Sequence, residues 1–282
     1  MTPGLGFALG AMLLFGVGDL IYKRAAAAGI DSRHFAMLQA WVFCPAVTLY
    51  ALATGTLELH ASALWGSLAG LFLLVAVDNF LASLKSGAVS TNAPIFRLNF
   101  TLTAALAVVF LGEPLGAAKI AALACALAAV WLLLAEPGAA GGRPDMRSLM
   151  QVLSATVAMA LVNFVHKIGV SQGALPATLV STQAWTFCSL ATLIALVRDR
   201  GYDVPARAWR YAPPAAVALV IAFVLLVYGL ARGPASVLAP VAQMGFVFTA
   251  FAGVVLFRET LTGRKKLGLA VALAALALFA VS

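Results

Sequence analysis

The sequence predicts an all-α membrane protein in which ten transmembrane helices form two inverted five-helix repeats. Three observations lead to this prediction. The chain of 282 residues is 63% hydrophobic and 10% charged, whereas soluble proteins carry about 25% charged residues. Its apolar runs have the length of about 20 residues that spans a bilayer. Several polar motifs also occur twice, about half a chain apart.

Ten apolar runs are long enough to cross a membrane. They cover residues 4–23, 34–54, 62–84, 88–111, 115–135, 149–169, 176–197, 211–231, 234–257 and 263–281. The connections between them are short, and the longest polar segments are 136–147 and 198–210. We therefore expect a first repeat at residues 1–137, a linker at 138–147 and a second repeat at 148–282, with no soluble domain.

The two halves share polar motifs in the same order. Asp19 to Lys23 aligns with Asn163 to Lys167 at an offset of 144 residues, and Gln39 to Cys44 aligns with Gln183 to Cys188. At an offset of 146, Ala93-Pro94 aligns with Ala239-Pro240, and Glu113 aligns with Glu259. Because five spans are an odd number, the second copy enters the membrane from the opposite face. Inverted repeats are common in secondary transporters, whose substrate site lies between the repeats near mid-membrane.

Basic residues are concentrated on one face of the predicted bundle. Loops that follow odd-numbered spans hold most of the lysines and arginines, while the other face has only Lys119, Lys167 and Arg232. We expect a multi-pass protein of the inner (plasma) membrane. The positive-inside rule then places both of its termini outside the cytoplasm. The net charge of +8 follows from these loops, so we expect no nucleic-acid partner.

An arginine inside the apolar run 88–111 is the strongest functional signal. Facing lipid, Arg97 would cost about 2.5 kcal/mol or more, so it must face protein, water or a ligand. Ser90 and Thr101 share its helix face, Asn92, Asn99 and Thr103 share the opposite face, and Ser236 and Gln243 repeat the first face in the second copy. A helix that is polar on two sides is expected to line a cavity. The guanidinium group suits a carboxylate or phosphate; the alternative is a permanent ion pair with Asp78.

Other polar side chains inside the spans are candidates for the same substrate site. Asp78, next to Asn79 in the third span, could bind a substrate amine, accept a coupling proton or neutralise Arg97. Tyr228 could add a hydroxyl group or simply pack. Two pairs, Gln39/Trp41 and Gln183/Trp185, lie too deep for an interfacial belt and could bond across helices or to substrate.

Asp19 and His166 are, with Asp78, the candidates for proton coupling. Asp19 would titrate unless it pairs with Lys23 one turn away, and histidine changes charge near neutral pH. Glu113 and Glu259 each open a helix, where the helix dipole favours a carboxylate, so we assign them structural roles.

Two glycine pairs and several absent motifs complete the residue analysis. Gly6/Gly10 and Gly66/Gly70 have the spacing that allows close helix contact in membranes. No nucleotide-binding loop, metal-ligand cluster or hydrolase motif occurs in the sequence. We therefore expect no enzymatic activity, no cofactor and no metal.

These features resemble the EamA-type branch of the drug/metabolite transporter superfamily. The resemblance lies in the paired five-span halves, the Ala-Pro pairs of spans 4 and 9, and the closing segments Leu111-Gly112-Glu113-Pro114-Leu115 and Phe257-Arg258-Glu259-Thr260-Leu261. It implies a central cavity surrounded by spans 1, 3, 4, 6, 8 and 9, with spans 5 and 10 at the periphery. Transporters of this kind export amino acids, other metabolites or drugs.

We therefore expect a secondary active transporter, an efflux protein that moves a small polar metabolite by alternating access around a mid-membrane cavity. The favoured substrate is an amino-acid-like zwitterion, with Arg97 on its carboxylate and Asp78 near its amine. The expected partners are this substrate and the lipid bilayer, with a monomer as the working hypothesis. The alternatives are a broad exporter of cationic drugs, which would use Asp78 and aromatic residues, and a non-transporting accessory subunit.

Overall fold

Helices account for the regular structure throughout the part of the chain that can be described. The computed structural model describes residues 2–58, 60–86, 89–134, 145–198, 201, 204–257 and 262–282. The elements are α1 (Leu5–Ala27), α2 (Ser32–Ala53), η1 (Ala61–Ala63), α3 (Leu64–Ser86), α4 (Val89–Arg97), α5 (Asn99–Leu111), α6 (Ala117–Leu134), α7 (Met146–Ser171), α8 (Pro176–Arg198), η2 (Ala206–Arg210), α9 (Ala212–Leu230), α10 (Ala235–Gln243), α11 (Gly245–Phe257) and α12 (Gly263–Val281).

Nine segments within these ranges are long and apolar enough to cross a membrane. They correspond to the first nine predicted spans. The tenth predicted span forms α12, which opens with the basic residues Arg264, Lys265 and Lys266 before its apolar stretch. The structure confirms an all-α membrane fold with two five-span repeats in this order. The linker prediction at 138–147 falls largely outside the described residues.

Spans 4 and 9 are broken, although the sequence analysis treated each as one continuous helix. α4 gives way to α5 at Leu98, and α10 gives way to α11 at Met244. Each break follows about one turn after a proline, Pro94 or Pro240. Proline lacks the N–H group that would continue the helical ladder, which permits such breaks. The Asn99 side chain donates a 2.7 Å hydrogen bond to the Phe96 carbonyl at the first break, which satisfies an oxygen that the helix no longer pairs.

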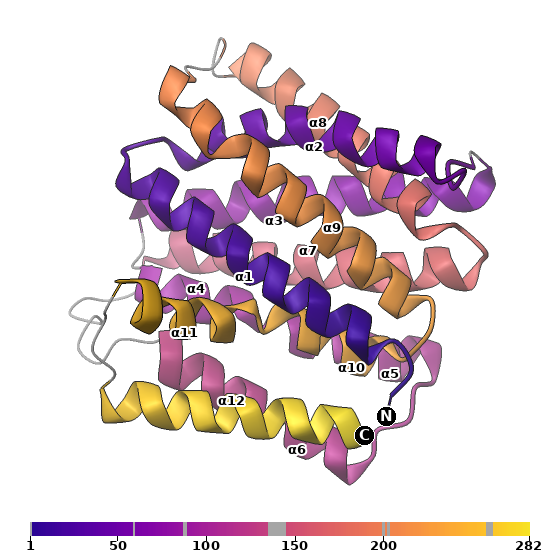
Figure 1. Cartoon of the computed structure of the whole chain (residues 1–282), viewed down its shortest axis with the longest axis vertical. Coiled ribbons are helices and arrows are strands. Elements are labelled where there is room, and N and C mark those ends of the chain that lie inside the picture. Colours follow the sequence, from indigo (N-terminus) through magenta and orange to yellow (C-terminus); the bar gives the residue numbers. More distant parts are fainter. Residues whose placement is uncertain are drawn as a thin grey trace.

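The helices form two matching pairs around the centre of the bundle. α1 packs along α9, and α3 packs along α7, while α2 and α8 contact each other at the edge opposite α6 and α12, where α2 packs on α9 and α8 packs on α3 (Figure 1). α6 and α12 pack against each other at one edge, beside the two chain termini (Figure 1). Spans 5 and 10 therefore lie at the edge of the bundle, as the family resemblance implied.

One of the two predicted glycine pairs makes close helix contacts along its whole length. A Cβ atom added at Gly66 would lie 2.4 Å from the Leu179 carbonyl oxygen, and one at Gly70 would lie 2.6 Å from the Gln183 carbonyl oxygen. These glycines thus let α3 approach α8. In the other pair, a Cβ at Gly10 would contact only the Leu225 side chain, and one at Gly6 would meet no described atom within 4 Å.

Glu113 has the structural role that the sequence predicted, but it caps a helix of the other repeat. Its carboxylate accepts hydrogen bonds from the backbone N–H groups of Ala235 (2.7 Å) and Ser236 (2.8 Å) at the start of α10, and from the Ser236 hydroxyl. Lys119 donates a 2.7 Å hydrogen bond to the same hydroxyl. Glu259, its sequence counterpart, lies outside the described residues.

Removing this cap is expected to lower stability. The variant Glu113→Ala should reduce the free energy of unfolding by about 2 kcal/mol, since a cap contributes about 1 kcal/mol and the variant also leaves Lys119 without its acidic neighbour. Thermal unfolding in detergent would measure the loss. Glu58→Ala is the matched control, because its side chain is partly exposed outside the helices, and it should unfold like the parent protein.

Candidate functional site

A cavity of about 400 Å³ lies at the centre of the bundle. Its walls come from α1, α2, α3, α4, α7, α8, α9 and α10. α2 and α8 thus add to the six spans that the family resemblance placed around the cavity. Ligand pockets commonly have volumes of about 300–1,000 Å³, so this cavity can hold a small metabolite.

The charged part of the cavity is an ion pair between α4 and α1. Arg97 Nη2 lies 3.0 Å from Asp19 Oδ2, and the Arg97 and Asp19 side chains keep 19% and 41% of their surface exposed. Arg97 also donates a 3.4 Å hydrogen bond to the backbone carbonyl of Gln243. Both charged groups line the cavity, so each retains hydrogen-bonding capacity that a ligand can use.

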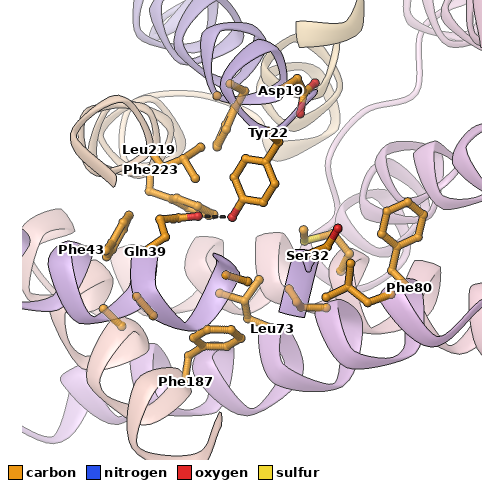
Figure 2. Close-up of a pocket in the computed structure, with 18 of the residues that line it drawn as sticks. Asp19, Tyr22, Ser32, Gln39, Phe43, Leu73, Phe80, Phe187, Leu219 and Phe223 are labelled. Atoms are coloured by element: carbon orange, nitrogen blue, oxygen red, sulfur yellow. Dashed lines mark hydrogen bonds between the residues drawn. The ribbon is translucent and has the colours of Figure 1, made fainter. Parts of the chain in front are cut away.

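Aromatic rings form a large part of the remaining wall. Phe223 on α9 makes edge-to-face contacts with Phe15 and Phe43, at centroid distances of 5.1 and 6.0 Å. Phe80 and Phe96 stack at 4.3 Å, and Phe187 also lines the cavity. Figure 2 shows the Tyr22 hydroxyl meeting the Gln39 side chain, to which it donates a hydrogen bond, with Phe43 and Phe187 beside them. The cavity therefore combines one charge pair with a largely apolar surface.

Many lining residues are sequence counterparts of one another in the two repeats. The pairs in which both members line the cavity are Phe15/Met159, Gln39/Gln183, Ala40/Ala184, Phe43/Phe187, Leu73/Leu219, Val77/Phe223 and Arg97/Gln243. Residues that meet their own counterparts around one space lie close to the pseudo-twofold axis of the repeats. The cavity is thus built at the repeat interface, where inverted-repeat transporters place their substrate.

The structure brings five of the predicted site residues to the cavity and leaves the others elsewhere. Those that line it are Asp19, Gln39, Arg97, Gln183 and Gln243. Those that do not are Asp78, Asn79, Asn99, Trp41, Trp185, Tyr228 and His166. The backbone of Ser90 is part of α4, but its side chain lies outside the described residues.

Arg97 does not pair with Asp78, which was the alternative to a ligand-binding role. Asp78 forms an ion pair with Arg33 at the start of α2, and both line a separate small pocket between α2, α3 and α8. Arg97 pairs with Asp19 instead. Arg97 reaches Asp19 across the cavity that both residues line, whereas Asp78 lies outside that cavity.

The remaining predicted residues make contacts within and between helices. Trp185 donates a 2.9 Å hydrogen bond to the Thr48 hydroxyl on α2, which agrees with the helix-packing alternative, while Trp41 is 44% exposed on the outer surface. The Asn79 amide donates to the Val75 carbonyl of its own helix. Asn99 is fully buried at the helix break, and Tyr228 stacks on Phe7 at 6.1 Å.

His166 and Gln183 carry polar atoms with no partner in the described part of the chain. His166 is completely buried, and neither of its ring nitrogens has a hydrogen-bond partner there; nor does the Gln183 side-chain oxygen. Each such atom costs about 1–3 kcal/mol. Gln183 on α8 is the polar neighbour of His166 and also reaches the cavity.

Several lining residues had not been assigned to the site from the sequence. They are Tyr22, Ser32 and the phenylalanines of the wall, and Arg33 had not been recognised as the partner of Asp78. Apolar side chains carry no signal of their own in an apolar helix. The repeat alignment could have revealed Phe43 and Phe187, because each follows a matching Gln-Ala-Trp motif.

Comparison with known proteins supports the fold and the repeat. A family model described as the EamA-like transporter family matches residues 2–135 and again residues 146–281. A solved structure titled "Crystal structure of protein" superposes with a TM-score of 0.83, at 18% sequence identity, over 99% of this chain and 96% of that chain. At this identity the likeness concerns the fold alone. No curated protein matches the chain.

Proposed function

Because the chain belongs to the EamA-like transporter family, we propose that it is a secondary transporter for small amino-acid-like zwitterions with apolar side chains. The Arg97–Asp19 pair that faces the cavity carries this proposal. A substrate carboxylate would replace Asp19 on the guanidinium group, and the substrate amine would take up the freed Asp19 carboxylate. Opposite charges exchanged in this way leave no ion unpaired in the low-dielectric interior.

The aromatic wall supports an apolar substrate side chain. A zwitterion held by Arg97 and Asp19 would extend toward Phe43, Phe187 and Phe223, which offer aromatic surface without a further charge. Gln39 and Gln243 could orient the polar end through hydrogen bonds. Phosphate esters fit less well, because Arg97 is the single cation among the residues that line this cavity.

The cavity is lined mainly toward one end of the bundle. Some wall residues line the cavity although their counterparts in the other repeat do not; Tyr22, Ser32 and Leu81 are examples. These residues lie toward the end of α1, the start of α2 and the end of α3. These ends adjoin the loops that are rich in lysine and arginine, which the positive-inside rule assigns to the cytoplasm. In this assignment the cavity opens to the cytoplasm, as an exporter requires for loading.

Flux measurements on purified protein in proteoliposomes would test the proposal. The panel should hold amino acids with apolar and charged side chains, alkylamines and sugar phosphates, each with and without a pH gradient. We expect uptake of apolar amino acids and no uptake of sugar phosphates. Flux of alkylamines alone would favour the cationic-drug alternative. Absence of flux for every compound, with folded protein, would favour an accessory subunit.

The variant Asp78→Asn distinguishes the zwitterion transporter from the alternative of a cationic-drug exporter. Asp78 pairs with Arg33 away from the cavity, and a partly exposed ion pair contributes at most about 1 kcal/mol. We therefore expect zwitterion flux to change by less than about fivefold. A cationic-drug exporter that relies on Asp78 would instead lose transport in this variant. The double variant Asp78→Asn/Asn79→Asp, which restores a carboxylate one residue away, is a control for the charge of this region.

A further inference from the structure

The cavity wall is asymmetric between the repeats. Away from the axis, the wall comes from first-repeat residues, and their second-repeat counterparts are buried instead. Counterparts of Gly18, Asp19, Tyr22, Phe80, Leu81 and Phe96 fall at 162, 163, 166, 226, 227 and 242, and none is more than 1% exposed. The two repeats therefore form twofold-related halves of a pathway, of which the first half is open and the second is closed.

The closed half contains polar residues in the arrangement of the open half. Asn163, His166 and Gln183 correspond to Asp19, Tyr22 and Gln39. Tyr22 and Gln39 are hydrogen bonded beside the cavity, whereas His166 and the Gln183 oxygen lack partners in the described structure. Buried polar groups are normally paired, so the completely buried His166, which lies behind the cavity-lining Gln183, requires an explanation.

A lysine bridge closes this half. Lys167 on α7 donates hydrogen bonds to the carbonyl oxygens of Leu230 (2.8 Å) and Gly233 (2.7 Å), at the end of α9 and in the turn to α10. It therefore joins the α3–α7 pair to the α1–α9 pair on the face that the cavity does not reach. Gly233 sits against the N-terminal segment, where an added Cβ would lie 2.1 Å from the Pro3 carbonyl oxygen.

We propose that Asn163 and His166 form, together with the cavity-lining Gln183, a second polar half-site for the substrate, which the Lys167 bridge closes here and which opens to the opposite membrane face when that bridge is released. This inference rests on the proposed transport function. In the open second half, the imidazole and amide groups face water and the polar end of a zwitterion. The second half has the neutral Asn163 where the first half carries Asp19, so the second half binds the substrate amine more weakly and favours release.

Chemical modification of His166 tests the inference without knowledge of the substrate. Purified protein in lipid nanodiscs would be treated with diethyl pyrocarbonate, which modifies accessible imidazole groups, and each histidine would be followed by peptide mass spectrometry. Exposed His60 is the internal reference. We expect Lys167→Met to raise the modification rate of His166 by at least about tenfold, because the closed state loses both hydrogen bonds that Lys167 donates. Lys167→Arg, which keeps a cationic donor, should behave like the parent protein.

Two further variants guard against general loosening of the fold. Gly233→Ala is the second gate variant. Its methyl group would meet the Pro3 carbonyl oxygen beside the Lys167 bridge, so it should also raise His166 modification. Lys23→Met, which changes the first-repeat counterpart of Lys167, should not raise the modification rate of His166. Rates that stay at the parental value in both gate variants, or that rise equally in Lys23→Met, would overturn the proposal. Because the readout needs no flux, an incorrect substrate class would leave these rates unchanged.

Discussion

Replacing Arg97 with alanine is expected to reduce zwitterion flux by about 100-fold, while the protein remains folded. The physical reason is the loss of a charge-assisted hydrogen bond of about 1.5–3 kcal/mol to the substrate carboxylate, and each 1.4 kcal/mol corresponds to a factor of about ten. The Asp19 side chain is 41% exposed toward the cavity, so its carboxylate can be hydrated when its partner is removed. Initial rates of uptake into proteoliposomes would measure the effect.

A double variant separates substrate binding from a purely structural ion pair. In Arg97→Gln/Asp19→Asn, two neutral amides replace the charges and can bond each other, so folding should be close to that of the parent protein. If the pair binds substrate, this variant is stable and inactive. Full transport by the double variant would show that the charges serve only to hold α1 against α4.

Replacing Gly66 with alanine is expected to lower the free energy of unfolding by about 3 kcal/mol. The added methyl group would lie 2.0 Å from the Thr182 hydroxyl and 2.4 Å from the Leu179 backbone oxygen. A backbone atom cannot move aside without displacing α8, and overpacking of this kind costs about 1–3 kcal/mol or more. The yield of folded protein and the thermal unfolding midpoint in detergent would both fall.

Gly6 provides the matched control for this prediction. It occupies the same motif spacing in α1, but an added Cβ would meet no described atom within 4 Å. Gly6→Ala should therefore leave the unfolding midpoint unchanged or raise it slightly, since alanine favours a helix. Equal losses in both variants would mean that helix propensity, and not the α3–α8 contact, controls the outcome.

The fold was largely predictable because its signals are long and redundant. Apolar runs of membrane length and motifs repeated in order, such as Gln39-Ala40-Trp41 and Gln183-Ala184-Trp185, depend on no single residue. The helix breaks at Leu98 and Met244 were less visible, because proline in a membrane helix is compatible with either a kink or a complete break. The prolines indicated the region but did not determine which residue ends the helix.

The site was only partly predictable, because partner choice depends on helix rotation and distance. Arg97 was identified by its cost in lipid, which needs no tertiary information. Its partner was not, because the sequence places both Asp19 and Asp78 inside apolar spans but does not show which carboxylate faces Arg97 across the cavity. The aromatic wall carried no signal in an apolar chain. Whether a residue lines the cavity or is buried depends on the conformational state of its repeat, which composition does not encode.

The contact between Arg97 and Gln243 has a consequence for how such a chain can arise by duplication. A residue near a twofold axis meets its own copy, and here the Arg97 guanidinium reaches the Gln243 backbone. Two identical halves assembled as a dimer would bring two guanidinium groups together within the membrane, where like charges repel strongly. Fusion into one chain lets the two copies diverge, so that one position keeps the charge and its twin becomes neutral. A single charged binding residue can therefore lie near the twofold axis in the fused protein, whereas a symmetric dimer would have to place two like charges there.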